Sequence, residues 1–295
     1  MSKAAQNSIN KISFRQKLRA YKKRPGSLIL MLLTWLSAII TVFIVLLLIF
    51  YILIKGIPHI KPELFAWEYN SENVSMMPAI INTVTMTFFS LLLAVPIGVF
   101  SAIYLVEYAK RGNRLVGIVR TTTETLAGVP SIVFGLFGYL IFVVACGFNL
   151  SMLSGALTLA IMILPTIMRT TEEALLSVPD SFREGSFGLG AGRLRTVFRV
   201  VLPSAVPGIL SGVILAIGRI VGETAALIYT SGTVAGIPEN MLQSGRTLSV
   251  HMYALLSEGL YTDQAYATAV VLLVLVLLIN MLSGVLAKKV SAKKG

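Results

Sequence analysis

Six long apolar runs constrain this chain more than any other feature of its sequence. Each approaches or exceeds the roughly 20 residues that an α-helix needs to cross a hydrocarbon core. Charged residues make up only 13% of the 295 residues, about half the share that is usual in soluble domains. The sequence therefore predicts an all-α integral membrane protein with six transmembrane helices, over Leu28–Ile54, Pro78–Tyr108, Thr121–Gly147, Leu150–Met168, Pro203–Gly232 and Ala265–Ala287.

The basic residues indicate how these helices are oriented. Most of the 25 lysines and arginines fall in the N-terminal tail, the 110–120 loop, the 169–202 loop and the C-terminal tail. By the positive-inside rule, we expect both termini and the 169–202 loop to be cytoplasmic. The net charge of +12 is thus mostly a topology signal. No segment is long enough to build the basic folded face of a nucleic-acid-binding protein, so the expected surroundings are a lipid bilayer and no nucleic acid.

The motifs of a catalytic protein are missing from the sequence. It contains no G-x-x-x-x-G-K-[ST] loop for the phosphates of ATP, no Ser/His/Asp set and no His-Glu-x-x-His motif. The single cysteine, Cys146, excludes an internal disulfide, and His59 and His251 lack metal-ligand spacing. We therefore expect a chain that is not an enzyme and that binds neither a metal nor a cofactor itself.

Two pairs of charged residues are predicted within or beside the spans. Arg219 lies inside a predicted span, and Glu223 follows four residues later, on the same helical face and close enough to pair. An arginine at the centre of a membrane costs about 2.5–3.5 kcal/mol, so this pair should face the protein interior, a partner or water. It either fixes the helix register or guides an anion along a transport path. Arg120 and Glu124 form a second predicted pair with the same spacing.

Small residues and prolines predict where helices pack closely and where they break. The helix that carries Arg219 contains the G-x-x-x-G pairs Gly208/Gly212 and Gly218/Gly222, which let helix backbones approach each other. Pro130 is expected to kink or break the third span because it removes a helical hydrogen bond.

A polar segment between two apolar runs carries the most specific motif. It contains Glu184-Gly185-Ser186, Gly190 six residues after the glutamate, and then Val200, Leu202 and Pro203. This pattern resembles the EAA loop of the permeases of ATP-binding-cassette (ABC) importers, with the two alanines and the isoleucine replaced. The resemblance implies a cytoplasmic coupling helix that docks on a separate ATPase subunit. Expected apolar contacts of that helix are Phe182, Phe187 and Leu189.

Three further segments narrow the resemblance: ETLAGVPSIVFGLFGYL at 124–140, GRIVGETAALIYTSG at 218–232 and GRTLSVHMYALLSEGL at 245–260. Together they resemble the permeases of phosphate-specific ABC importers, and among these the A-type (PstA) subfamily. The resemblance implies a MetI-like five-helix core plus an N-terminal helix in the bacterial inner membrane. In this interpretation Arg219 attracts phosphate and Glu223 is its counter-charge. The implied domains are a tail at 1–27, a first helix and outer loop at 28–75, a permease core at 76–290 with the coupling loop at 169–203, and a tail at 291–295.

The resemblance also implies partners. These are a homologous PstC-like permease, two PstB-like ATPase subunits that bind ATP and magnesium, and a PstS-like phosphate-binding protein that delivers the substrate. Other interpretations stay open at this point. The chain could be a permease for sulfate, molybdate or phosphonate, since Arg219 suits any oxyanion. A secondary transporter would usually show an internal repeat, and a structural membrane protein would need neither an intramembrane arginine nor a coupling loop.

Overall fold

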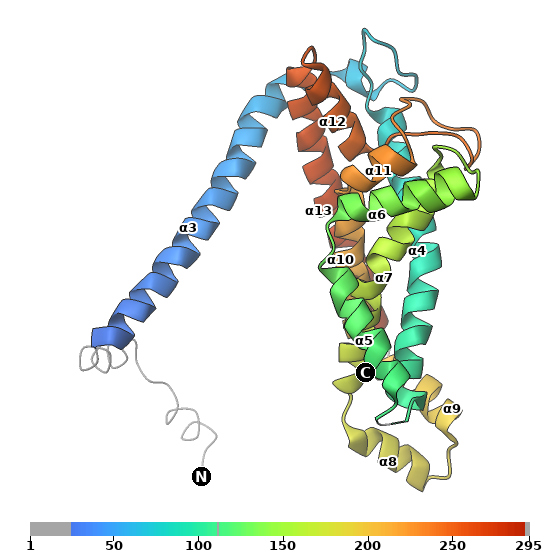
Figure 1. The fold of residues 1–295 in the computed structure, drawn as a ribbon. Coiled ribbons are helices and arrows are strands. Elements are labelled where there is room, and N and C mark those ends of the chain that lie inside the picture. The colour runs from blue at the N-terminus through green and yellow to red at the C-terminus, as the bar shows by residue number, and fades with distance from the viewer. Residues whose placement is uncertain (1–24, 111, 293–295) are drawn as a thin grey trace. The chain divides into compact units, whose positions relative to one another are not determined.

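The computed structural model describes residues 25–110 and 112–292, and every regular element within these ranges is a helix (Figure 1). Three of the elements are π-helical continuations of longer helices, named η3, η4 and η5. The elements, in chain order, are α3 (Pro25–Gly56), η1 (Ile57–His59), η2 (Pro62–Phe65), α4 (Met77–Ile103), η3 (Tyr104–Tyr108), α5 (Arg114–Ala127), α6 (Ser131–Gly138), η4 (Tyr139–Ala145), α7 (Met152–Leu176), α8 (Asp180–Gly188), α9 (Arg193–Thr196), η5 (Val197–Val201), α10 (Leu202–Val221), α11 (Ala225–Thr230), α12 (Leu248–Glu258) and α13 (Thr262–Ala292).

The chain divides into two compact units between Ile54 and Lys55. The described part of the first unit is α3, whose most apolar window has a mean hydropathy of 3.1 and no buried residue. A helix that is apolar on all sides suits a surrounding of lipid or of other membrane helices. Nearly all of the basic tail predicted at 1–27, and the last residues of the tail predicted at 291–295, lie outside the described residues.

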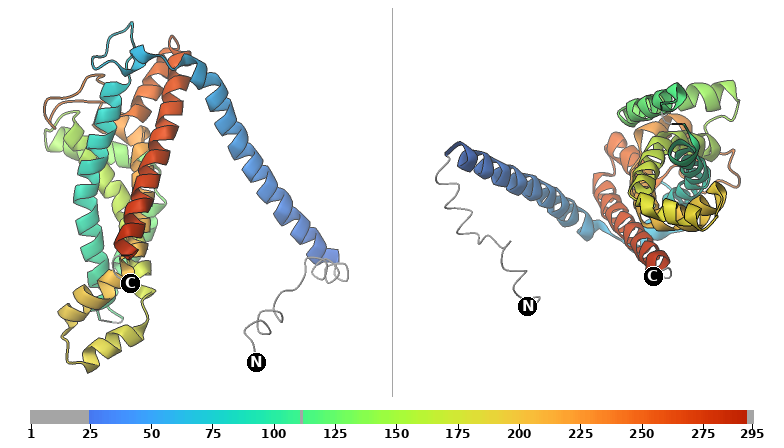
Figure 2. Two further views of the ribbon diagram at one scale, coloured as in Figure 1. Left: turned by 180° about the vertical axis from the view of Figure 1, so that it is seen from behind. Right: turned by 90° about the horizontal axis from the view of Figure 1, so that it is seen from below.

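Helix α7 is the centre of the second unit. Of its most apolar window 56% is buried, against 33% for the corresponding windows of its neighbours α4 and α10. Its side chains Leu159, Ile163 and Ile167 are completely buried and recur every four residues, so they line one face of the helix. Figures 1 and 2 show α4, α7, α10 and α13 running the length of this unit.

Small residues allow α7 to approach both neighbours closely. Gly98 of α4 lies against Ile167, while Gly208 and Gly212 of α10 lie against Ala174 and Thr170. Any side chain at these glycines would overlap the facing helix. The predicted close packing at Gly208 and Gly212 is therefore confirmed, and the facing helix is α7. Gly218 has open space around it, so the second predicted G-x-x-x-G pair makes no such contact within the described chain.

Within the described residues, five helices are long and apolar enough to cross a membrane, and there are six spans if a bent pair of helices is counted as one. They correspond in order to the six predicted spans, and the boundaries differ most in two of them. The α7 helix continues to Leu176, beyond the predicted end at Met168. The next helix starts at Arg193 rather than Pro203 and ends at Val221 rather than Gly232. Arg193, Arg195 and Arg199 made its first turns look like loop, although arginine is a good helix former.

The third predicted span is the bent pair. Helix α5 ends at Ala127, α6 begins at Ser131 after Pro130, and the two helices meet at 106°. Pro130 therefore breaks the span, as predicted. After the break, α6 and η4 run across the other helices instead of along them (Figure 1). Gly135 of α6 lies directly against the backbone of Ala226, which joins α6 to α11.

Helix α12 was not predicted. It has only 11 residues, begins after Thr247 and ends at Gly259, whose φ of +70° is readily adopted only by glycine. Its short apolar stretch gives no transmembrane signal, because a span needs about 20 residues. It lies at the end of the unit opposite α8 and α9, beside the start of α13 (Figure 1). We refer to these two ends as the α8 end and the α12 end.

Replacement of Gly212 by valine should destabilise the core by about 1–3 kcal/mol, because the new side chain would force α10 away from Thr170 of α7. Gly218→Val on the same helix is the matched control, since it adds the same atoms where no neighbour lies within 4 Å. The loss of stability in both variants is measured by thermal unfolding of the purified chain in detergent. Equal losses in the two variants would contradict the packing described here.

Candidate functional site

A short helical segment protrudes at the α8 end. Helix α8 stops in a Schellman turn, in which the Gly190 N–H donates to Phe187 O at 2.9 Å and the Ala191 N–H donates to Ser186 O at 3.1 Å. Gly190 has a φ of +81°, the left-handed conformation that this turn requires. The hydroxyls of Ser186 and Thr196 lie 2.8 Å apart. This hydrogen bond joins α8 to α9 and closes the turn.

The turn presents apolar side chains to its surroundings. Leu189 is 91% exposed, and Phe182 and Phe187 are about half exposed on α8. Glu184 and Gly185 are also exposed, so the first two residues of the predicted motif stay accessible. Leu202 and Pro203 lie at the start of α10 and are half-buried, with Leu202 packed on the core residues around Ala205. Exposed apolar side chains on a rigid turn are typical of a docking surface.

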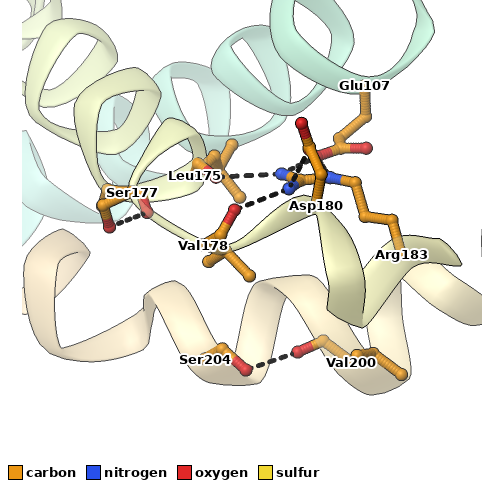
Figure 3. Close-up of polar contacts among 9 residues, drawn as sticks. Glu107, Leu175, Ser177, Val178, Asp180, Arg183, Val200 and Ser204 are labelled. Atoms are coloured by element: carbon orange, nitrogen blue, oxygen red, sulfur yellow. Dashed lines mark hydrogen bonds and ion pairs between the residues drawn. The ribbon is translucent and has the colours of Figure 1, made fainter. Parts of the chain in front are cut away.

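Arg183 fastens α8 to the membrane helices (Figure 3). Its Nη2 and Nε donate to Glu107 Oε1 at 2.7 and 3.1 Å, and Glu107 belongs to η3 at the end of the α4 helix. Its remaining hydrogen bonds go to the carbonyls of Leu175 and Val178, at 2.9 and 2.8 Å, and to Asp180. The Arg183 and Glu107 side chains are only 14% and 9% exposed. These bonds connect α8 to both the α4 helix and α7.

A cavity of about 730 Å³ opens beside this ion pair. It lies between the ends of η3 and α7 and the helices α5 and α8. Phe187 and Arg193 line one part of it, and the Arg193 guanidinium lies 5.4 Å above the ring of Tyr108. Lys110 and Arg120 line the other part. The cavity has charged and apolar walls and adjoins the turn that follows α8.

The predicted pair of Arg219 and Glu223 is not formed. Helix α10 ends at Val221 and Gly222 caps it, so Glu223 no longer continues the helical register that would place it over Arg219. Glu223 instead accepts the Ala226 N–H at 3.0 Å and thereby starts α11. It is 8% exposed. Arg219 is half-buried, and its guanidinium has no hydrogen bond or ion pair with any residue that the structure describes.

The second predicted pair, Arg120 and Glu124, is also wrong. Arg120 forms its ion pair with Glu172 of α7, and Glu124 is exposed on α5. The partner belongs to a different helix because α5 packs beside the end of α7. The same end of α7 carries the exposed pair of Arg169 and Glu173.

Glu107 and Glu172 are site residues that the sequence reasoning missed. A usable signal existed for Glu107, which is the only charged residue in the predicted span Pro78–Tyr108 and so required a partner. Glu172 was placed in a loop because the predicted α7 span ended too early. Among the described residues, no group of three or more His, Cys, Asp or Glu side chains could hold a metal ion.

Comparison with known families gives one match. Residues 94–293 match the model of the family described as "Binding-protein-dependent transport system inner membrane component".

Three curated proteins show the range of similarity. The chain is 33% identical to the "Probable ABC transporter permease protein YqgI" of Bacillus subtilis, over 78% of this chain and 84% of that protein. It is 32% identical to "Phosphate transport system permease protein PstA" of Haemophilus influenzae, over 90% and 95%. A 42% identity to "Phosphate transport system permease protein PstA 1" of Mycobacterium tuberculosis covers about half of each chain, 52% and 50%.

Solved structures of two ABC transporters share the fold. A chain of a bacterial alginate ABC transporter superposes with a TM-score of 0.67 at 16% identity, over 92% of this chain and 98% of that one. A chain of the MetNI methionine ABC transporter superposes with a TM-score of 0.57 at 21% identity, over 73% and 94%. At these identities the likeness concerns the fold alone.

Removing the Arg183 charge should loosen the α8 end. Arg183→Gln leaves the Glu107 carboxylate buried without a counter-charge, which typically costs about 3–5 kcal/mol. We expect a lower unfolding temperature and faster proteolysis within residues 177–192. The double variant Arg183→Gln/Glu107→Gln should recover much of the loss, because no lone charge remains. If single and double variants were equally unstable, the ion pair would not be the anchor.

Proposed function

The chain belongs to the family of binding-protein-dependent transport system inner membrane components, and from this premise we propose that it is the A-type permease of an ABC importer for inorganic phosphate. It is a multi-pass protein of the bacterial inner membrane, and its relatives are permease subunits. Phosphate as the substrate is supported by the names of the relatives from Haemophilus influenzae and Mycobacterium tuberculosis. The energy source in this proposal is ATP and magnesium bound to two partner ATPase subunits.

One observation carries the proposal: a continuous helix leads to Arg219 from the turn around Leu189 and Gly190, which we call the docking turn. It runs from Arg193 to Val221 through α9, η5 and α10. Arg219 lies 26 positions after Arg193, which corresponds to about 40 Å of helix. Force applied at the turn therefore reaches Arg219 through one continuous helix. A permease that couples ATP hydrolysis to substrate movement needs such a connection.

The α8 end is the docking surface for one ATPase subunit in this proposal. Leu189, Phe182 and Phe187 supply apolar contacts that enter a groove of the ATPase. Closure of the ATPase dimer pulls on α8, and the Arg183–Glu107 pair passes the displacement to α4 while the carbonyl contacts of Arg183 pass it to α7. The basic residues between 169 and 202 support a cytoplasmic position for this end.

Arg219 is the proposed contact for phosphate inside the membrane. Its guanidinium is half-buried and has no carboxylate partner among the described residues. Guanidinium donors match two oxygens of a phosphate at once, and they gain strength where water is scarce. Glu223 is not the counter-charge at rest that its spacing predicted, because it caps α11 instead.

The remaining parts of the importer lie on other chains. A homologous permease completes the translocation path, because an open face of α10 around Gly218 and Leu215 has no partner within the described chain. A phosphate-binding protein delivers the substrate at the α12 end. Because no soluble binding domain is predicted on this chain, that protein sets most of the selectivity.

Uptake of labelled phosphate tests this function. Cells whose only phosphate system contains this chain should lose uptake when the chain is deleted, and Arg219→Gln should lower uptake at least tenfold because a contact made during translocation is lost. Lys61→Gln, which removes an exposed charge near η2, should have little effect.

Excess sulfate and molybdate serve as competitors in the same assay. Uptake that resists both anions identifies phosphate as the substrate. If phosphate uptake survived deletion of the chain, the substrate assignment would fall, and labelled sulfate or molybdate would be tested next. If Arg219→Gln transported normally, Arg219 would have no role in the path.

Coupling is tested separately at Leu189. Leu189→Asp places a charge in the expected apolar contact, so the affinity of the ATPase subunits for the permease should fall at least tenfold, equivalent to about 1.4 kcal/mol. Co-purification and ATPase activity in lipid nanodiscs measure this. Leu260→Asp is the matched control, since Leu260 is 80% exposed at the α12 end. Unchanged ATPase binding by Leu189→Asp would remove the turn from the docking surface.

A further inference from the structure

A second arginine, far from the docking turn, is buried without a counter-charge. Arg246 is 5% exposed, and no carboxylate lies within ion-pair distance of it in the described part of the chain. Its guanidinium carbon lies 4.6 Å from the centre of the Tyr69 ring. His251 of α12 is completely buried and meets the same ring edge-on, with ring centres 6.2 Å apart. Tyr69 thus covers both side chains.

Four polar atoms of this cluster have no hydrogen-bond partner among the described residues. They are Nε and Nη2 of Arg246 and both ring nitrogens of His251. Buried polar atoms in folded proteins are nearly always hydrogen-bonded, so these four atoms are candidates for bonds to a water or a ligand. Nε and Nη2 form one edge of the guanidinium, the edge that binds two oxygens of a carboxylate or phosphate in parallel.

The backbone holds Arg246 firmly in place. Its N–H donates to Val234 O at 2.9 Å, and its carbonyl accepts from Nδ2 of Asn82 on α4 at 3.2 Å. The neighbouring Leu248 N–H donates to the Thr83 hydroxyl at 2.8 Å. Asn82 and Thr83 both belong to α4. The backbone that carries the Arg246 guanidinium is therefore held by a membrane helix and not by a loop alone.

The segment that carries Tyr69 is strained. Val74 has a φ of +46° and is 1% exposed, an unfavourable conformation for a β-branched residue. Such strain costs about 1–3 kcal/mol and is concentrated at ligand clamps and switch regions. The segment is held down by the Tyr261 hydroxyl, which donates to Ser71 O at 3.1 Å. The segment that places Tyr69 over Arg246 therefore contains a strained residue and is held in place by a hydrogen bond.

Electrostatics at the cluster favour an anion. Burial, and secondly the Arg246 charge, lower the pKa of His251 to about 3, so this ring is neutral at physiological pH. A neutral imidazole offers one N–H donor and one acceptor. The cluster then combines one permanent positive charge with three donor groups, a set that matches the oxygens of a tetrahedral anion.

We propose that Arg246 and His251 form a second oxyanion subsite, separate from Arg219 and covered by Tyr69 in this conformation. The ligand class is a tetrahedral oxyanion, and phosphate is the member expected if the function proposed above is correct. The subsite lies on the side of the core where α12 begins, so an anion entering from the α12 end would meet it. Displacement of Tyr69 uncovers the side chains of Arg246 and His251, and its return shields a bound anion from water.

The test uses the complex of the two permeases and the ATPases, purified without the binding protein. Its unfolding temperature is measured with increasing inorganic phosphate, because a ligand that binds the folded state stabilises it. With Arg219→Gln as the background, phosphate should still raise the unfolding temperature. Adding Arg246→Gln should abolish that rise. A rise that persists unchanged in the double variant would overturn the proposal.

Further variants separate binding from folding. Arg246→Lys keeps the charge but not the paired donors, so half-saturation should need at least tenfold more phosphate even if Arg246→Gln does not fold. Tyr69→Phe keeps the ring and should respond normally. If Arg246 were purely structural, Arg246→Lys would have a lower unfolding temperature in the absence of phosphate. Its half-saturating phosphate concentration would be unchanged, and that result would refute the subsite. Sulfate and molybdate are titrated in parallel. An Arg246-dependent rise with those anions and none with phosphate would uphold the subsite and reject phosphate as the substrate.

Discussion

Hydrocarbon offers no hydrogen-bond partners, and this constraint decides how each polar group in the membrane core is used. The backbone meets it by forming helices throughout the described residues. Of the buried or half-buried arginines in the described residues, Arg183, at the α8 end, meets the same need with bonds to two carboxylates and two carbonyls. Arg219 and Arg246 do not meet it within the described chain. The satisfied arginine holds α8 to the membrane helices, whereas the two unsatisfied ones are the proposed anion contacts.

The six spans and the break at Pro130 were predictable because they depend on local properties of the chain. Apolar length and the missing proline N–H act within a few residues and need no knowledge of the tertiary structure. The Glu184–Gly190 motif was recognisable for a similar reason, since its glycine is required by a turn whose hydrogen bonds are all local.

The charge pairs were not predictable, because their partners are chosen by packing. Arg120 was assigned to Glu124 from helical spacing, but Glu172 approaches it from a helix about fifty residues away in sequence. Arg219 and Glu223 have the right spacing, yet the helix between them ends at Gly222. Arg246 could not be recognised as buried either, since the sequence placed it in an outer loop and gave no hint that Tyr69 would cover it.

The π-helical turns have a mechanical consequence. Two of them border the docking segment: η3 carries Glu107, to which Arg183 is bound, and η5 joins α9 to α10. A π-turn holds one residue more per hydrogen-bonded ring than an α-helix, and such turns are frequent at functional sites. Shifting that extra residue along the helix changes the direction of the side chains beyond it without interrupting the helix. We therefore expect the two helices that contain η3 and η5 to rotate about their axes when the extra residue shifts. Rotation of the helix, rather than bending, would then be the motion that reaches Arg219.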